Sequence, residues 1–495
     1  MTTCPLDSLM SHVRHTEALA QAGELLGWDM ETMMPAKGAA ARGEQSAALA
    51  AAVHRMQAAP ELGDWINAVD PTQKDPVTQR NLALIARDHA RAKRMPKALV
   101  EELARLRSQA YEAWLAAREA NAFAGFAPIL KRMVDLKKEE AAALSTGEVS
   151  AYDVLLQQFE PDMSAAQVAR LFASLRQGVV HLRERIDAAP RDQSLPQFDI
   201  PKDTQLALAR LLAERFGFDF SAGRLDLSVH PFSSGTGGDV RITTRVDQAD
   251  PLDTIYSTIH ETGHAVYEQG IGADFAFTPV GRHCSMGVHE SQSRLFENQL
   301  GRSRSFCTWL FKTMTTELGG VGVESAEHLY RIVNNVTPGF IRTEADEVHY
   351  NLHIMLRFDL ERDLLQGSLE VDDLEEAWNA RFAQDFGRSV PDARRGILQD
   401  VHWSSGYIGY FPTYTLGNLY AGQLFQALSR DLPNLQDDLS EGRFGEIISW
   451  LRTRIHTHGA LYPAPELMRN ATGQDLSPAE LVAYLDAKYS DLYGL

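Results

Sequence analysis

Cysteine is scarce in this chain of 495 residues, which contains only Cys4, Cys284 and Cys307. An odd, sparse set without C-x-x-C spacing argues against a disulfide framework and against a cysteine metal knuckle. We interpret Cys284 and Cys307 as buried free thiols, with a structural pair as the alternative. Such usage is typical of a reducing compartment, so we expect a cytoplasmic protein.

Positive charge is also in short supply. The chain has 48 Lys and Arg against 66 Asp and Glu, a net charge of -18. Because no basic stripe is present to neutralise phosphates, a nucleic-acid partner is disfavoured. The first residues lack the basic and apolar regions of a signal peptide, and no run of 18 apolar residues exists, so we expect neither secretion nor a membrane span.

Repeats, low-complexity tracts and long linkers are absent too. Length alone favours about three domains, but no change in composition supports a cut, so we predict one domain over 1–495. Apolar residues recur at helical spacing along most of the chain, which predicts a mainly α fold. The clearest strand patterns are 224–230 and 239–246. They flank a turn-rich segment, 233–238, and predict a hairpin just before the segment described next.

His260-Glu261-Thr262-Gly263-His264 is an H-E-x-x-H motif. On a helix, this spacing places two imidazoles one turn apart, where they can hold zinc beside the Glu261 carboxylate. Asp250 and Pro251 supply a helix start, and Gly270 a helix end. We therefore predict a zinc peptidase in which Glu261, as general base, takes a proton from zinc-bound water. Two histidines satisfied in a packed core are the alternative.

A catalytic zinc site needs a third protein ligand. No histidine follows at metzincin spacing, so a glutamate on a second helix is the better model. Glu290 is favoured because it lies near a helix start, although an ion pair with Arg294 would explain it as well. Glu297 and Glu268 remain candidates, but Glu268 lies in line with the two histidines on one helix, which cannot complete a tetrahedron.

Two later segments carry further candidates. A predicted helix over 338–366 places Arg342, Asp346, His349 and His353 on one face, where the arginine can bind a carboxylate or form ion pairs within the helix. A Gly- and aromatic-rich loop, 396–414, is expected to line a substrate cleft. Its His402, Tyr410 and Tyr414 could donate hydrogen bonds to an oxyanion, or simply pack in an aromatic core.

A series of short motifs runs through most of the chain. In order, they are Trp28 to Pro35, Arg42 to Gln45, Tyr152-Asp153, Phe159 to Pro161, His230 to Phe232, Asp239 to Thr243, His260 to His264, His289 to Gln292, Ile341 to Asp346 and Gln399 to Trp403. This set resembles the thermostable zinc carboxypeptidases of the carboxypeptidase Taq family. One departure is Asp162, where glycine is expected after Glu160-Pro161.

The resemblance implies roles that spacing alone leaves open. Glu290 becomes the third metal ligand, Arg342 binds the C-terminal carboxylate of the substrate, and His402 and Tyr410 assist binding or stabilise an oxyanion. It also implies a single large helical body with a deep groove, similar to the neurolysin-like zinc peptidases, and a small sheet beside the zinc helix. A homodimer is implied, as is zinc, with cobalt as a possible replacement.

The predicted reaction is release of single C-terminal residues from peptides with a free carboxylate, with broad specificity. Proline at the cut and a terminal acidic residue would be disfavoured. One alternative is a zinc oligopeptidase that cuts internal bonds in the same groove. Another is a metal-binding helical scaffold without activity, against which the intact Glu261 argues.

Overall fold

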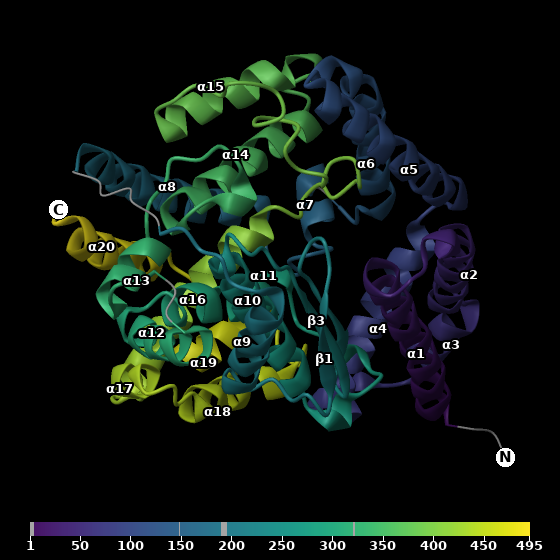
Figure 1. Cartoon of the computed structure of the whole chain (residues 1–495). Helices are drawn as coiled ribbons and strands as arrows, with labels where there is room; N and C mark the ends of the chain where they lie inside the picture. The colour runs from purple at the N-terminus through teal and green to yellow at the C-terminus, as the bar shows by residue number, and fades with distance from the viewer. Residues whose placement is uncertain (1–3, 148, 190–195, 320–321) are drawn as a thin grey trace. The chain divides into compact units, whose positions relative to one another are not determined.

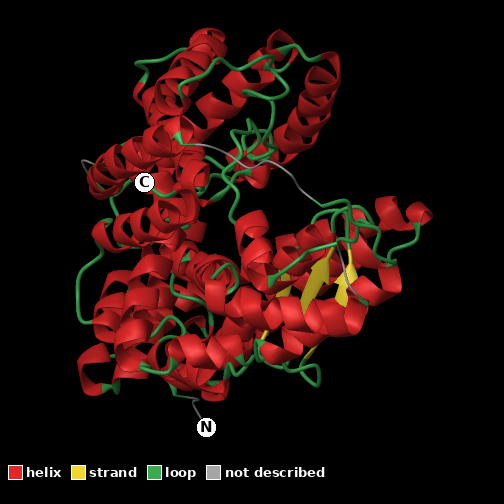
Figure 2. Ribbon diagram, turned by 60° about the vertical axis from the view of Figure 1, so that its left-hand side comes forward, coloured by secondary structure: helices red, strands yellow, loops and turns green. Residues whose placement is uncertain are grey.

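The computed structural model describes residues 4–147, 149–189, 196–319 and 322–495. Helices dominate these residues, and three short strands form the only sheet among them, so the predicted mainly α fold is confirmed (Figures 1 and 2). None of the described helices is both long enough and apolar enough to cross a bilayer. Cys284 and Cys307 are buried free thiols, as predicted.

Contacts divide the chain into two compact units. The first contains Met1–Lys93, Ser194–Asn334 and Tyr420–Leu476, and the second contains Arg94–Gln193, Asn335–Leu419 and Ser477–Leu495. Each unit is assembled from three separate stretches, so no single cut in the sequence separates them. One domain over 1–495 and the deep groove stay predictions.

The first unit carries the sheet and most of the helices. Its helices are α1 (Pro5–Thr32), α2 (Ala39–Gln57), α3 (Pro60–Ala68), α4 (Pro76–Arg94, which ends at the boundary), α9 (Lys202–Arg215), α10 (Pro251–Gly270), α11 (Met286–Arg294), the π-helix η6 (Leu295–Leu300), α12 (Arg304–Leu318), α13 (Ala326–Val333), α17 (Leu435–Ser440), α18 (Gly445–Arg454) and α19 (Ala464–Thr472). Helix α10 packs against α9, α11 and strand β3 (Asp239–Thr244).

The second unit contains helices and loops, with no strand among its described residues. It contains α5 (Lys97–Ala120), α6 (Ala127–Leu144), α7 (Ala151–Leu156), α8 (Ala165–Ala188), α14 (Glu347–Gln366), α15 (Leu374–Phe386) and α20 (Ala479–Tyr493). Helix α16 (Pro412–Asp431) begins in this unit and ends in the first. The long loop between α15 and α16 carries the Gly- and aromatic-rich segment singled out in the sequence.

The strand topology differs from the predicted hairpin. Strands β1 (Gly223–Leu227) and β3 pair in parallel, and β2 (Ser233–Thr236) pairs antiparallel on the other side of β3. The turn-rich segment thus forms a strand itself, and the tight turn is Gly237-Gly238, between β2 and β3. Gly237 has a φ of 59° and Gly235 one of 92°, conformations that glycine adopts without strain.

The predicted helix over 338–366 begins later than expected. Helix α14 starts at Glu347, because the Asp346 side chain caps it by accepting hydrogen bonds from the backbone N–H groups of Val348 and His349. Arg342 lies before this cap, in a short 3₁₀ turn over Arg342–Glu344. The predicted single face of Arg342, Asp346, His349 and His353 is therefore wrong.

Candidate active site

Helix α10 carries the H-E-x-x-H motif, as its local sequence predicts. It begins at Pro251, and the Asp250 side chain accepts a hydrogen bond from the backbone N–H of Asp253 at 3.3 Å. Ile255, Ile259 and Val266 are buried and anchor the inner face. The rings of His260 and His264, one turn apart on this rigid element, have centroids 5.0 Å apart.

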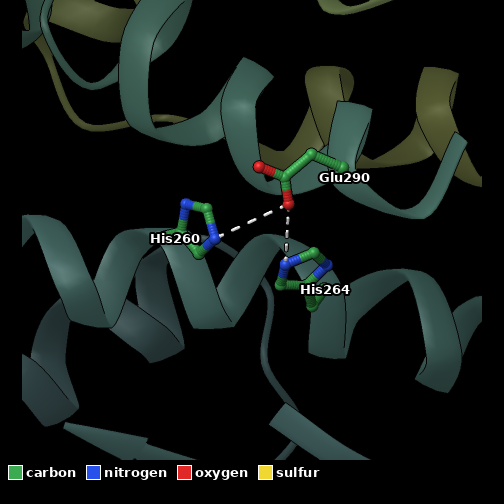
Figure 3. A group of neighbouring side chains, drawn as sticks. All are labelled: His260, His264 and Glu290. Carbon is green, nitrogen blue, oxygen red and sulfur yellow. Dashed lines mark ion pairs between the residues drawn. The ribbon is translucent and has the colours of Figure 1, made fainter. Parts of the chain in front are cut away.

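Gly263 allows α11 to approach α10 closely. A Cβ atom at this position would lie 2.6 Å from both the carbonyl oxygen of Gln292 and the Cα of Ser293, so only glycine fits. This approach brings Glu290 Oε2 to 3.4 Å from His264 Nε2 and 3.8 Å from His260 Nε2 (Figure 3). The three ligands predicted from the sequence are thus brought together.

The other two candidate glutamates lie elsewhere around the histidines. Glu297 lies on the π-helix η6. Its Oε2 accepts hydrogen bonds from His260 Nδ1 at 2.9 Å and from Arg294 Nη1 at 2.8 Å. With Nδ1 engaged by Glu297, Nε2 is the ring nitrogen of His260 that faces Glu290. Glu268 contacts His283 and His289 instead.

The charges around the two histidines suit a cation. Burial opposes protonation of His260, yet the hydrogen bond to Glu297 and the charges of Glu290 and Glu261 raise the pKa of its ring to about 9. Burial and the neighbouring His289 lower the pKa of His264 to about 3. Glu297 is paired with Arg294 and Arg302, so the Glu290 and Glu261 carboxylates are the ones that remain to face a divalent ion beside the two imidazoles. Two imidazole nitrogens and a carboxylate oxygen within 4.8 Å of one another match the donor set of a catalytic zinc.

Glu261 lies between the two histidines in sequence and is 7% exposed. Burial raises the pKa of its carboxyl to about 7; His260 opposes this shift, and the charges of Glu290 and Glu297 add to it. A carboxyl group that titrates near neutral pH suits proton transfer in both directions.

In the second unit, Arg342 forms part of a buried charge cluster with Asp400 and Arg357. Arg342 Nε donates to Asp400 Oδ1 at 2.9 Å, and Arg357 Nε donates to Asp400 Oδ2 at 2.7 Å. Arg342 Nη1 also donates to the hydroxyl of Tyr350 at 3.2 Å. Two guanidinium groups share one carboxylate, so the cluster carries one positive charge in excess.

His402 and Tyr410 lie beside this cluster. His402 Nδ1 is 3.9 Å from Asp400 Oδ1, and its ring centroid is 5.7 Å from that of Tyr410. His402 Nε2 and the hydroxyl of Tyr414 are 3.1 Å apart, and the Arg342 guanidinium carbon lies 4.9 Å from the Tyr414 ring centroid. Burial and the charge of Arg342 lower the pKa of His402 to about 3, so its ring is neutral at neutral pH. Arg342, His402 and Tyr410, predicted separately, therefore form one group.

Glu361 on α14 is a residue that the sequence analysis missed. It is fully buried, and its carboxylate accepts hydrogen bonds from Trp403 Nε1 at 2.9 Å, the Gly409 backbone N–H at 3.0 Å and the Tyr152 hydroxyl at 2.9 Å. Three donors on α7 and the 403–409 loop thus converge on one carboxylate. The motifs containing Tyr152 and Trp403 were a signal for this contact, but nothing in them identified Glu361 as the acceptor.

Known proteins resemble this chain over almost its whole length. The profile of the family described as Carboxypeptidase Taq (M32) metallopeptidase matches residues 8–489. The chain is 40% identical to Thermostable carboxypeptidase 1 of Thermus thermophilus and 35% identical to Carboxypeptidase 1 of Bacillus subtilis, over 98% of this chain and of each relative. The solved structure of Trypanosoma cruzi metallocarboxypeptidase 1 superposes with a TM-score of 0.96 at 33% identity, covering 98% of this chain and 99% of that one. The Pyrococcus furiosus carboxypeptidase structure gives 0.94 at 33% identity, over 99% of both chains.

Proposed function

This chain belongs to the carboxypeptidase Taq (M32) family of metallopeptidases, and on that premise we propose that it removes single residues from the C-terminus of peptides, with zinc as its metal. Membership of the family makes it a metal-dependent carboxypeptidase. The observation that carries the finer proposal is the convergence of His260, His264 and Glu290 beside Glu261. We expect broad specificity for the released side chain.

His260, His264 and Glu290 are the residues that would hold the ion. When bound, a divalent ion there polarises the scissile carbonyl and lowers the pKa of water. The second carboxylate, Glu297, fixes the ring of His260 through Nδ1 and keeps Nε2 directed at the site. Zinc is favoured because two imidazoles and a carboxylate are its common catalytic donors, and cobalt accepts the same set.

Glu261 would act as the general base. Its carboxylate takes a proton from the attacking water and then delivers it to the nitrogen of the leaving amino acid. A pKa near 7 lets one carboxyl group serve both steps at neutral pH. Since the carboxyl is almost fully buried, bulk water does not compete for this proton.

The excess positive charge of the second-unit cluster supports a carboxylate-binding role for Arg342. Asp400 contacts Nε and Nη2 of Arg342, and Tyr350 accepts from Nη1. These contacts hold the planar guanidinium group in one orientation. Each terminal nitrogen of an arginine carries two hydrogens, so N–H groups remain for a substrate carboxylate. We propose that this is the group that selects a free C-terminus.

His402 and Tyr410 are proposed as donors to the oxyanion or to the peptide backbone. A neutral imidazole donates through one nitrogen only. The Tyr414 hydroxyl, 3.1 Å from His402 Nε2, orients the ring. The ring of Tyr410 packs edge-on against Phe159 at 5.0 Å, which restricts its orientation.

The decisive experiment compares a peptide that ends in a free carboxylate with its C-terminally amidated counterpart. Protein stripped of metal by a chelator is restored with zinc or cobalt, and products are followed by mass spectrometry. We expect a ladder of peptides shortened one residue at a time from the free peptide, and no product from the amidated one or from the apoprotein. Equal cleavage of both peptides at internal bonds would instead identify an oligopeptidase.

We also propose a homodimer in the cytoplasm. The compartment is supported by the three cysteines, all of which are free. Light scattering coupled to size-exclusion chromatography tests the dimer: a mass of about twice the 55.0 kDa of the chain is expected, and a mass of one chain would contradict it.

A further inference from the structure

A second group of metal-binding side chains lies beside the first, in the same unit. Glu268, at the end of α10, accepts hydrogen bonds on Oε1 from His283 Nδ1 at 3.1 Å and His289 Nε2 at 3.0 Å. The donor atoms of the three residues lie within 4.8 Å of one another. Neither His283 nor His289 belongs to the H-E-x-x-H motif, and the proposed hydrolysis uses none of the three.

Hydrogen bonding alone leaves part of this group unsatisfied. Glu268 is 4% exposed, and both of its hydrogen bonds are made by one oxygen, Oε1. The other oxygen, Oε2, is buried and has no hydrogen-bond partner among the described residues. A buried carboxylate with an unpaired oxygen is costly, and such oxygens in native proteins usually face an ion or a water molecule.

The donor set also fits a particular class of ion. Two imidazole nitrogens and one carboxylate oxygen, drawn together at hydrogen-bond distances, are the donors that Zn²⁺, Co²⁺ and Ni²⁺ prefer, whereas Mg²⁺ and Ca²⁺ prefer oxygen alone. The side chain of His283 is 33% exposed, against 6% for Glu268 and 14% for His289. It therefore offers a route for the ion to enter and a side on which water completes its coordination.

We propose that Glu268, His283 and His289 form a second binding site for a divalent transition-metal ion. This site and the first share two helices: Glu268 follows His264 by one turn of α10, and His289 precedes Glu290 on α11, whereas His283 lies in the segment just before α11. The rings of His264 and His289 stack with centroids 4.5 Å apart. An ion in the second site would thus tie α11 to the end of α10 and fix the ring that supports His264.

Metal stoichiometry tests this site directly. The full-length protein is stripped with a chelator, titrated with Co²⁺, and read by its visible absorption and, after gel filtration, by elemental analysis. We expect two equivalents in the wild type and one in His283→Ala. His283→Phe, which fills the same partly exposed space without a donor, serves as a second variant, and circular dichroism establishes that both are folded.

The first site is assessed separately with His260→Ala, which is outside the second group. This variant is expected to bind one equivalent, and His260→Ala combined with His283→Phe none. One equivalent in the wild type, or two in both folded His283 variants, would overturn the second site and leave Glu268 as a hydrogen-bonding residue only. Loss of one equivalent of Co²⁺ in His260→Ala tests the first site, whatever the His283 variants show. The proposals for the first and the second metal site can therefore fail independently.

Discussion

The two charge clusters of this protein are built in opposite ways. The ligand group of the first unit lies between residues 260 and 290, on two helices that are close in sequence and directly packed. The cluster of the second unit draws on Arg342, Arg357 and Asp400, from a short turn, a helix and a loop. Local spacing identified the two histidines of the first and family resemblance added Glu290, whereas the pairing of Arg342 with Asp400 in the second required tertiary structure.

The clusters also differ in the sign of their unbalanced charge. In the first, Arg294 and Arg302 pair with Glu297, and the carboxylates of Glu290 and Glu261 remain beside the two imidazoles. In the second, two guanidinium groups share one carboxylate. The first therefore favours a cation and the second an anion. A carboxypeptidase needs both, because it must hold a metal ion and recognise a substrate carboxylate, so changes in either cluster should have distinct signatures.

The largest effect is expected in the first cluster, for Glu261→Gln. This change keeps the size of the side chain and the metal ligands but removes the proton acceptor. We expect kcat to fall by about 10² to 10⁴-fold, with unchanged metal content by elemental analysis. Glu261→Asp, which keeps a carboxylate, should retain part of the activity. A fully active Glu261→Gln enzyme would contradict the general-base role.

The corresponding change in the second cluster is Arg342→Ala. If Arg342 binds the substrate carboxylate, kcat/KM for a free peptide should fall. The expected fall corresponds to a loss of roughly 2–5 kcal/mol of transition-state stabilisation. Preference for free over amidated peptides should fall as well, while metal content stays the same. The matched control is Arg395→Ala, whose guanidinium forms an exposed pair with Asp392; it should leave the preference intact. If Arg342→Ala keeps the full preference for free over amidated peptides, Arg342 does not bind the substrate carboxylate.

Gly263→Ala should separate the helices of the first cluster. The added Cβ would overlap the α11 backbone, so we expect a loss of about 1–3 kcal/mol in unfolding free energy and weaker metal binding. Gly43→Ala is the control, since Gly43 is exposed on α2 with nothing within 4 Å of the added Cβ. That change should raise stability by about 0.5–1 kcal/mol. Urea unfolding of both apoproteins measures the contrast, and equal effects would show that close packing at Gly263 is unimportant.

Glu361 should give the second unit a distinctive dependence on pH. Burial raises the pKa of its carboxyl to about 7, although its three hydrogen-bond donors oppose the shift. Because the folded state holds the proton more tightly, this stabilisation is full below the unfolded pKa and lost as pH rises through about 7.

Glu361→Gln removes this titration. The stability of wild type relative to the variant should therefore be greater at pH 5 than at pH 8, by on the order of 2 kcal/mol. Denaturant unfolding at the two pH values measures it, with the fluorescence of the tryptophans as one probe. A difference that does not change with pH would show that Glu361 keeps one charge state throughout.

The smallest expected effect concerns Asp162, the position where the family pattern suggested glycine. Asp162 has a φ of 69°, a left-handed conformation that glycine adopts without strain. Its backbone N–H donates to Gln157 Oε1, and glycine would keep this bond. We expect Asp162→Gly to raise the unfolding free energy by up to about 1 kcal/mol, measured by urea unfolding, with no change in activity. A destabilised variant would mean that the aspartate side chain contributes more than its backbone strain removes.

Elements with local signals were predictable from the amino-acid sequence. The cap at Asp250, the apolar stripe of α10 and the spacing of His260 and His264 all lie within one helix, so helical periodicity was sufficient. Residues 289–292 indicated Glu290 through family resemblance, whereas spacing left Glu268 and Glu297 open. Close packing at Gly263 explains why Glu290 is the one that reaches both Nε2 atoms.

Features that depend on contacts between distant segments became visible in the folded chain. The structure shows that β1 and β3 are parallel. This could not be predicted, because strand pairing depends on where the chain returns and not on the residues of either strand. The structure moved the start of α14 to the Asp346 cap, and it paired Arg342 with Asp400, far along the chain. It also revealed Glu361 and the unpaired oxygen of Glu268. Contacts between distant segments leave no fixed spacing in a sequence. The cluster of Arg342, Arg357 and Asp400 therefore required the tertiary structure, whereas the H-E-x-x-H motif was recognisable from the sequence.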